Sequence, residues 1–436
     1  MTRIPHFRWL VAAVLFLATA LSFFDRQVLS VLAPPIIADL SMNDVSYSWV
    51  VFGFLLSYSL MFTVGGWMID RLGTRLGMAL SVGIWSLASL LHAVANSALG
   101  LGAFRFLLGV GEGGCFPGAA KAVLEWFPKK ERAMAMGFAT AGGSAIGAVL
   151  APPVIVWTSI HIGWRGAFLV TGFLGACWLV IWLLAYSLPE NSRFLFDEER
   201  RHIAQDGREQ AQGGARRGFS NPIKAWGGLL KLREVQGLVV ARFLFDPVFY
   251  LYMFWIPRYL NQERGASLER IGQLTWIPFL TLGISSVLGG WVSDRLVVRG
   301  LSINKARKTM LAASALLTPV SILSVFVSDA ETAVFLMSVL MFAHGFWITN
   351  YMTMIGDMFP GRVVATVVGL TGTAGGIGGF LTSPLIGRVV QSFSFAPVFI
   401  AAGLIYPVSA LIILALVREI KRLDAAAPRL QVHSGV

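Results

Sequence analysis

Stretches of about 20 mostly apolar residues follow one another along almost the whole chain, and they restrict its fold more than any other feature. A helix satisfies its own backbone hydrogen bonds, so it is the structure that such a stretch adopts in hydrocarbon. The composition points to the same class, because 13% of the residues are charged, about half the share in soluble proteins. The sequence therefore predicts an all-α membrane protein with twelve transmembrane helices, at residues 9–32, 47–69, 76–97, 100–121, 134–157, 166–188, 235–260, 270–293, 307–328, 332–355, 363–388 and 396–417.

Lysine and arginine set the orientation of these helices, because they are retained on the cytoplasmic side. With both termini inside, cytoplasmic segments hold 27 of the 35 basic residues, against five in extracytoplasmic segments. We therefore expect a multi-pass protein with both termini in the cytoplasm. We expect no cleaved signal peptide, since the first apolar run is long and contains Asp25 and Arg26. The net charge of +12 then faces anionic lipid headgroups of the bilayer, and it indicates no nucleic-acid partner.

The chain divides into two similar halves. Gly65–Leu72 and Gly289–Leu296 agree at six of eight positions, at an offset of 224 residues. Between the halves lies a polar stretch with charges of both signs, which is typical of a linker. We predict an N-terminal six-helix bundle at residues 1–188, a cytoplasmic linker at 189–234, and a C-terminal six-helix bundle with a short tail at 235–436. Parallel six-helix repeats are typical of transporters that work by alternating access.

Four ionisable side chains lie well inside predicted helices, where each costs about 2.5–3.5 kcal/mol to insert. Asp25 and Arg26 lie in the first helix, and Arg105 and Glu112 lie two turns apart on one face of the fourth. Arginine binds both oxygens of a carboxylate, and a desolvated carboxyl favours its protonated form. The set therefore predicts proton-carrying acids beside an anion clamp. The alternative is two neutralising pairs, Asp25 with Arg26 and Arg105 with Glu112, that only stabilise packing.

A further pair, Arg242 and Asp246 in the seventh helix, has the i, i+4 spacing of a local salt bridge, which explains it adequately. Candidates to line a substrate cavity are Tyr58, Trp347, Thr349, Asn350, Thr371 and Thr373. The chain has no GxxxxGK[ST] loop for ATP, its six histidines are scattered, and its two cysteines lie in separate apolar runs. We therefore expect no enzyme activity, no metal site and no cofactor.

The sequence GWMIDRLGTR at residues 66–75 resembles the loop signature of the major facilitator superfamily. In that family the acid of this loop caps a neighbouring helix and pairs with basic groups, which locks the cytoplasmic gate. The resemblance assigns gating roles to Gly66, Asp70, Arg71, Arg75, Asp294 and Arg295. Ordinary capping of a helix end by the same charges is the alternative.

Further motifs resemble the anion:cation symporter branch of that family, which includes bacterial hexuronate, galactonate and glucarate transporters. The most telling are DRQVLSVLAP at 25–34, RFLLGVGE at 105–112, KAVLEWFP at 121–128 and FWIPRYL at 254–260. The resemblance implies the twelve-helix fold of the family and proton-coupled uptake of an organic acid. Carried over to matching positions, it implies that Asp25 and Glu112 bind the proton. It also implies that Arg26, Arg105 and Tyr58 bind the substrate carboxylate.

Departures from the branch bear on the substrate. Many relatives have Asn and Tyr where this chain has Ser22 and Phe23, and galactonate-type members have Asn where it has Gly372, which favours a hexuronate-like pocket. We therefore expect a monomeric proton symporter of the bacterial inner membrane that imports a sugar-acid anion, a hexuronate such as glucuronate or galacturonate. The alternatives are a symporter for an aldonate, glucarate or aromatic carboxylate, an exporter of organic anions or drugs, and a membrane receptor built like a transporter.

Overall fold

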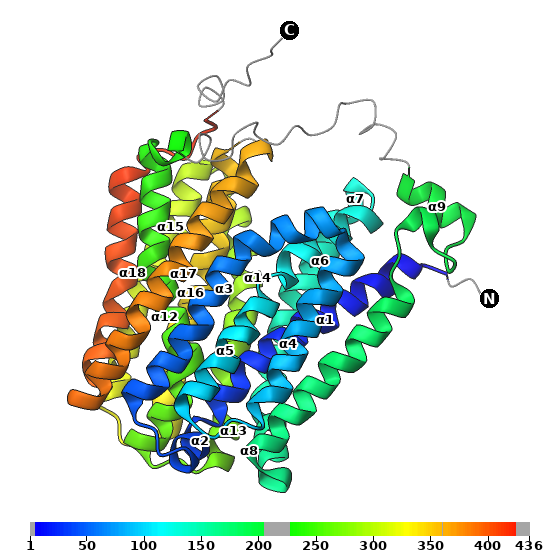
Figure 1. Ribbon diagram of the computed structural model, residues 1–436. Helices are drawn as coiled ribbons and strands as arrows, with labels where there is room; N and C mark the ends of the chain where they lie inside the picture. The colour runs from blue at the N-terminus through cyan, green and yellow to red at the C-terminus, as the bar shows by residue number, and fades with distance from the viewer. Residues whose placement is uncertain (1–4, 205–226, 360, 424–436) are drawn as a thin grey trace. The chain divides into compact units, whose positions relative to one another are not determined.

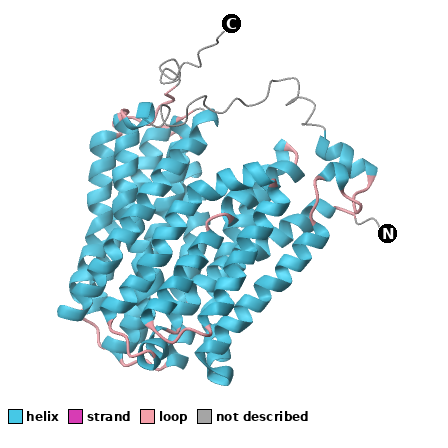
Figure 2. Cartoon of the chain, viewed as in Figure 1, coloured by secondary structure: helices cyan, strands magenta, loops and turns pink. Residues whose placement is uncertain are grey.

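The computed structural model describes residues 5–204, 227–359 and 361–423. Two compact units make up the chain, residues 1–216 and residues 217–436. Within the described residues the chain forms helices joined by short loops, without a β-strand (Figures 1 and 2), so the predicted all-α fold is confirmed. The predicted boundaries of the two bundles, at 188 and 234, stay predictions, and residues 205–226 of the predicted linker lie outside the described part.

Unit 1 is helical throughout its described residues. In chain order its elements are α1 (Phe7–Val31), α2 (Ala33–Asp39), α3 (Asp44–Leu72), α4 (Thr74–His92), α5 (Ala98–Glu112), α6 (Cys115–Trp126), α7 (Lys129–Met136), a π-helical turn η1 (Gly137–Gly142), α8 (Gly143–Ala185), a 3-10 turn η2 (Pro189–Asn191) and α9 (Asp197–Ala204). α8 packs against both α1 and α4, and α5 packs against both α3 and α4.

Unit 2 repeats the helical pattern. Its elements are α12 (Arg233–Arg264), α13 (Leu268–Leu274), α14 (Ile277–Val298), α15 (Ile303–Leu317), a 3-10 segment η3 (Thr318–Val325), α16 (Ala330–Met358), α17 (Gly361–Ser392) and α18 (Ala396–Leu416). α12 packs against α17 and α18, and α16 packs against α14 and α15.

The described helices account for all twelve predicted spans. Ten helical stretches in the described residues are long and apolar enough to cross a membrane. One of them, Met134–Ala185, covers the fifth and sixth predicted spans, which Gly163 separates by its left-handed backbone (φ 77°). Glycine adopts this conformation without the steric cost that a side chain would add. α17 covers the predicted span at 363–388, and it completes the set.

Polar side chains fix where several of these helices begin. The Asn43 side chain accepts a hydrogen bond from a backbone N–H in the first turn of α3, and Ser97 and Asp329 do the same for α5 and α16. Such caps satisfy amide groups that have no partner inside the helix. α1 ends at Val31 because Pro34 and the proline after it have no N–H to continue the hydrogen-bond ladder.

The predicted starts of the fifth and ninth helices are too late. The helical backbone begins at Lys129 rather than 134, and at Ile303 rather than 307. Both helices open with a charged turn, and hydropathy places the boundary where the apolar residues begin. The ninth span also finishes as a 3-10 segment that ends at Val325 rather than 328.

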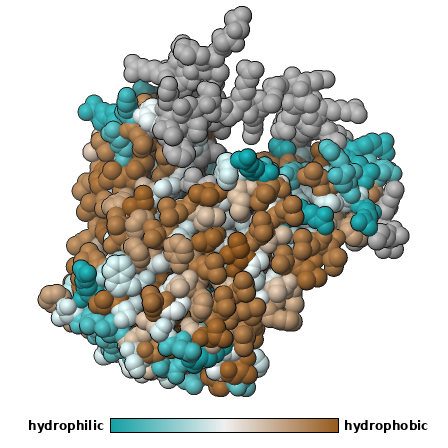
Figure 3. Space-filling view, in the orientation of Figure 1, coloured by the Kyte–Doolittle hydropathy of each residue, from teal (hydrophilic) through white to brown (hydrophobic). Residues whose placement is uncertain are grey.

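The outer surface carries large apolar side chains. Leu99, Leu184 and Phe173 are 85%, 76% and 65% exposed. In Figure 3 hydrophobic side chains cover most of the visible face, and hydrophilic residues gather at helix ends, for example around α9. Apolar surface of this extent is typical of a face that contacts another apolar medium, here the lipid.

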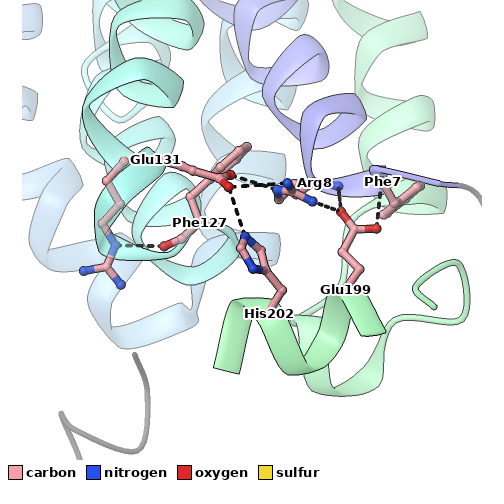
Figure 4. Close-up of polar contacts among 7 residues, drawn as sticks. Phe7, Arg8, Phe127, Glu131, Glu199 and His202 are labelled. Atoms are coloured by element: carbon pink, nitrogen blue, oxygen red, sulfur yellow. Dashed lines mark hydrogen bonds and ion pairs between the residues drawn. The ribbon is translucent and has the colours of Figure 1, made fainter. Parts of the chain in front are cut away.

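α9 lies within the predicted linker, and it is attached to the start of α1 (Figure 4). The Glu199 carboxylate accepts hydrogen bonds from the backbone N–H groups of Phe7 (3.1 Å) and Arg8 (3.2 Å) and pairs with the Arg8 guanidinium (2.7 Å). Arg8 also pairs with Glu131 at 2.9 Å, and a ring nitrogen of His202 lies 3.0 Å from the same carboxylate. The carboxylate of α9 thus satisfies amide groups that α1 itself leaves without acceptors.

Glu131 connects the two ends of this network. Partial burial works to raise the pKa of its carboxyl, but the hydrogen bonds from Arg8 and His202 outweigh burial, so the pKa lies below its ordinary value. A carboxyl stabilised in this way is charged at neutral pH, and it holds α7 to α1 and α9.

Candidate functional site

The charged cluster of unit 1 centres on an ion pair between α1 and α5. The Nε atom of Arg26 lies 2.6 Å from an oxygen of Glu112, and both side chains are almost completely buried (4% and 0% exposed). Ser22, one helical turn before Arg26, donates a hydrogen bond to the same carboxylate oxygen (3.0 Å) and accepts one from Arg26 (3.3 Å). The other oxygen of Glu112 has no hydrogen-bond partner among the described residues. In this structure Glu112 therefore pairs with Arg26, the arginine that is predicted to bind a substrate carboxylate.

Aromatic rings enclose the Arg26 guanidinium. Its central carbon lies 4.3 Å from the ring centroid of Tyr58 and 4.8 Å from that of Phe23. Tyr58 is itself stacked on Phe54 at 5.6 Å, and it is 8% exposed. Cation–π contacts of this kind stabilise a guanidinium without satisfying its N–H groups. The rings thus hold the guanidinium in position, and Glu112 and Ser22 accept its hydrogen bonds.

Arg105 lies behind this pair and contacts the backbone of α1. It is fully buried, and it donates hydrogen bonds to the carbonyl oxygens of Asp25 (3.2 Å) and Arg26 (2.7 Å). Its guanidinium also lies 4.9 Å from the Phe54 ring centroid. In this structure Arg105 fixes the position of α1 at the charged residues, and its binding of substrate stays a prediction.

Asp25 lies in a different environment from its neighbour in the sequence. Its carboxyl is 1% exposed and accepts a hydrogen bond from Ser89 on α4 (2.8 Å). The Ser89 hydroxyl lies 3.4 Å from that of Thr171 on α8. Within the described residues Asp25 makes no ion pair, and its second oxygen has no hydrogen-bond partner. Within the described residues the Asp25 carboxyl is therefore held by a hydroxyl group and not by a cation.

The structure forms neither of the two neutralising pairs that the sequence suggested as an alternative. Asp25 does not pair with Arg26, and Arg105 does not pair with Glu112; the pair that forms joins Arg26 to Glu112 between helices. The two acids therefore do not share one environment. Glu112 faces an arginine, whereas Asp25 faces hydroxyl groups on α4 and α8. Their predicted role in binding protons stays a prediction.

In unit 2 two of the predicted cavity residues are buried in helix packing. Trp347 is fully buried against the rings of Phe245 (5.6 Å) and Tyr406 (5.4 Å). Asn350 is also fully buried, and its amide donates hydrogen bonds to the carbonyl oxygens of Gly289 (3.3 Å) on α14 and of a residue one turn earlier in α16. Both side chains therefore stabilise unit 2 in this structure, and their contact with substrate stays a prediction.

Thr371 and Thr373 lie on α17, and the first of them reaches the ion pair of α12. Arg242 donates hydrogen bonds to Asp246 (3.0 Å) and to the hydroxyl of Thr371 (3.3 Å). The predicted i, i+4 salt bridge is present, with side chains 15% and 12% exposed. Thr373 is half-buried two residues further on. The structure thus extends the local pair into a contact between α12 and α17.

The predicted gating residues of unit 1 lie where α3 ends. Asp70 pairs with Lys121 of α6 at 2.9 Å, and Lys121 also donates to the carbonyl oxygen of Ile69 (3.2 Å). Arg75 donates to the carbonyl oxygen of Leu183 at 2.6 Å. The other two predicted gating residues of this unit make no ion pair among the described residues. Arg71 lies over the Trp67 ring at 5.4 Å, and Gly66 lies beside Pro117.

The corresponding loop of unit 2 carries a similar network. Asp294 pairs with Arg307 of α15 at 2.9 Å, and Arg307 also pairs with Asp357 of α16 at 3.1 Å. Arg295 lies over the Trp291 ring at 5.2 Å, as Arg71 does over its tryptophan. In each unit the acid of the repeated motif has a basic partner, which both gating and helix capping require. The gating role stays a prediction.

Several residues of the site were missed from the sequence. Ser89 donates a hydrogen bond to Asp25 and lies beside Thr171. Phe54 stacks on Tyr58 and lies beside the guanidinium groups of both arginines. Serine, threonine and phenylalanine are ordinary residues in membrane helices, so only their contacts identify them. No group of three or more His, Cys, Asp or Glu side chains in the described residues is arranged to hold a metal ion.

Comparison with known proteins places the chain in a family. A sequence profile of the Major Facilitator Superfamily matches residues 15–381. The chain is 30% identical to the hexuronate transporter of Escherichia coli (strain K12) over 415 residues, which cover 95% of this chain and 94% of that protein. It is 33% identical to the galacturonate transporter of Dickeya chrysanthemi over 292 residues, which cover 67% of this chain and 83% of that protein.

A solved structure shows the same fold. The inward open xylose transporter of E. coli superposes with a TM-score of 0.74 at 14% identity, covering 94% of this chain and 97% of that one. At this identity the likeness concerns the fold alone. Together with the profile and the full-length relatives, it shows that the chain belongs to the major facilitator superfamily, whose members are membrane transporters rather than enzymes.

Proposed function

We propose that this protein is a proton-coupled symporter that imports a sugar-acid anion, a hexuronate such as glucuronate or galacturonate, across the bacterial inner membrane. Both termini would then lie in the cytoplasm, as the distribution of basic residues predicts. The names of the relatives support the substrate class, since hexuronate and galacturonate transporters match this chain over most of its length.

The observation that carries the proposal is the buried ion pair between Arg26 and Glu112, at 2.6 Å. A substrate carboxylate and the Glu112 carboxylate are alternative partners for the same guanidinium. When Glu112 is ionised, it holds Arg26, and substrate must displace it. When Glu112 is protonated, the charge of Arg26 is released for the substrate, because the neutral acid is a weaker partner than the carboxylate. Competition for one arginine therefore couples a proton to an anion.

Asp25 fits the same scheme as a second proton site. It is buried without a cationic partner, and the hydrogen bond from Ser89 orients its carboxyl. Arg105 fixes the α1 backbone at both Asp25 and Arg26, so a change at one residue is passed to the other through a rigid segment. Tyr58, beside Arg26, supplies a hydroxyl for the substrate on the same face.

The proposal is tested by uptake of labelled glucuronate and galacturonate into vesicles with an imposed pH gradient. The wild-type protein should accumulate one of them when the outside is acidic. Glu112→Gln should abolish accumulation driven by the gradient but keep exchange of labelled for unlabelled substrate. Glu190→Gln removes an exposed carboxyl outside the cluster, and it should behave like the wild type. Full gradient-driven accumulation by the Glu112 variant, or no transport of any sugar acid, would refute the proposal.

A further inference from the structure

The Asp25 carboxyl lies where three helices of unit 1 meet. Asp25 belongs to α1, Ser89 to α4 and Thr171 to α8, and the three residues are 1%, 1% and 2% exposed. The Ser89 hydroxyl donates to Asp25 at 2.8 Å, and it lies 3.4 Å from the Thr171 hydroxyl. The Thr171 hydroxyl in turn lies 3.2 Å from the carbonyl oxygen of Phe168. Two buried hydroxyl groups therefore form a short chain that ends on the carboxyl.

The number of protons in this chain determines which group donates. A hydroxyl has one proton to donate, and its oxygen can also accept. Charged Asp25 can only accept, so the Ser89 proton points to it, and Thr171 is then the donor between the two hydroxyls. Protonated Asp25 has an O–H group of its own, which the Ser89 oxygen can accept. A guanidinium only donates, so an arginine in the place of Ser89 would serve the charged form alone. The hydroxyls suit a carboxyl that gains and loses a proton.

The charged and titratable side chains on the same four helices bind other groups. They act on Asp25 through space, but a change at a hydroxyl group leaves them in place. Among the described residues these contacts are Arg26 with Glu112 (2.6 Å), Arg105 with the carbonyl oxygens of Asp25 and Arg26, the His92 ring with the carbonyl oxygen of Ala88 (2.6 Å), and Arg165 with Asp39 (2.6 Å).

We propose that Ser89 and Thr171 are positioning residues that set the pH at which Asp25 releases its proton. This inference rests on the proposed function, in which Asp25 is the second proton site. A hydrogen bond donated to a carboxylate stabilises the charged form, so Ser89 favours release of the proton. A donor behind Ser89 polarises its hydroxyl and strengthens the bond to Asp25, so Thr171 acts in the same direction with a smaller effect.

The test is an infrared titration of the purified protein. The carbonyl-stretch band of protonated carboxyl groups is followed against pH, and Asp25→Asn identifies the part of the band that belongs to Asp25. Ser89→Ala removes the donor and should raise the midpoint of this part by about one to two pH units, the equivalent of one hydrogen bond to a charged group. Thr171→Val keeps the shape of the side chain and should raise the midpoint by less, whereas Thr171→Ser keeps the hydroxyl and should restore it.

Ser86 provides the matched control. It lies on α4 three positions before Ser89, it is 3% exposed, and its hydroxyl has no hydrogen-bond partner among the described residues. Ser86→Ala should therefore leave the midpoint of Asp25 unchanged. A role in packing alone would change the thermal midpoint of the serine variants, but it would not move the titration of the carboxyl.

The possible failures of the two proposals are distinguishable. An unchanged Asp25 midpoint in Ser89→Ala, or an equal shift in Ser86→Ala, would overturn this inference and leave the proposed function standing. If Asp25→Asn removes no titrating band, this inference fails, and Asp25 is not the second proton site. Coupling through Glu112 is measured separately, by uptake into vesicles, and its failure would refute the proposed function whatever the infrared midpoints are.

Discussion

Replacing Glu112 by glutamine should tighten substrate binding at alkaline pH. In the structure the Glu112 carboxylate lies 2.6 Å from Arg26, and in the proposed mechanism the substrate has to break this charge-assisted hydrogen bond before it binds. Such a bond is worth about 1.5–3 kcal/mol. Glutamine keeps the size of the side chain but removes the charge, so the affinity of the variant should exceed that of the wild type by about 10- to 100-fold.

The assay is titration calorimetry of the purified protein with glucuronate and galacturonate between pH 5 and pH 9. Wild-type affinity should weaken as the pH rises, because ionised Glu112 competes with the substrate for Arg26. The variant should bind with an affinity that changes little over this range. Glu190→Gln controls for the loss of a carboxyl as such, and it should follow the wild-type curve. The reasoning is refuted if the Glu112 variant binds more weakly than the wild type at pH 9, or if it keeps the wild-type pH dependence.

Three further changes test the packing and the surface networks. Gly143→Ala places a methyl group 2.1 Å from a hydroxyl of α1, so it should lower the free energy of unfolding by about 1–3 kcal/mol, seen as a lower thermal midpoint in detergent. In the control, Gly137→Ala, the new methyl group meets no atom within 4 Å, and stability should not fall. Equal losses of stability in the two variants would contradict the close packing. The pKa of Glu131 lies below its ordinary value of 4.5, so its contribution to stability is present above that pH and disappears as the pH falls through the lowered pKa. The decrease in thermal midpoint that Glu131→Gln causes should therefore be smaller at pH 4 than at pH 7. An equal decrease at both pH values would count against the network. Asp70→Asn breaks a pair with Lys121 whose acid is 76% exposed, so it should change stability by no more than about 1 kcal/mol; a clear loss of uptake rate would then indicate gating, and an unchanged rate would indicate capping alone.

The helices could be predicted because hydrocarbon leaves few choices to a long apolar run. Hydropathy could not place the charged turns with which two of these helices begin, at Lys129 and Ile303, because the helical backbone there starts before the apolar run. α9 was missed for the same reason. Its sequence DEERRHIA has acids in the first turn and bases in the last turn, as helices prefer, but its polarity suggested a linker.

The charged residues of the site could be identified because a charge stands out in an apolar helix, but their partners could not. Asp25 and Arg26 are neighbours in the sequence, yet successive side chains on a helix point about 100° apart. Arg26 therefore reaches Glu112 of α5, and Asp25 reaches Ser89 of α4. Which neighbouring helix each side chain meets depends on packing between segments far apart in the sequence, such as Ser22 and Glu112, which are 90 residues apart, and local spacing carries no information on it.

The contact between Glu199 and the first amide groups of α1 has a consequence for how this half of the protein is made. Glu199, which accepts the hydrogen bond from the Phe7 amide, is synthesised 192 residues after Phe7. The first turn of α1 therefore gains this cap only after translation has passed the last long helix of unit 1. A separately expressed N-terminal half should accordingly run through residue 204, the end of α9. A half that stops at residue 188 leaves the beginning of its own first helix uncapped.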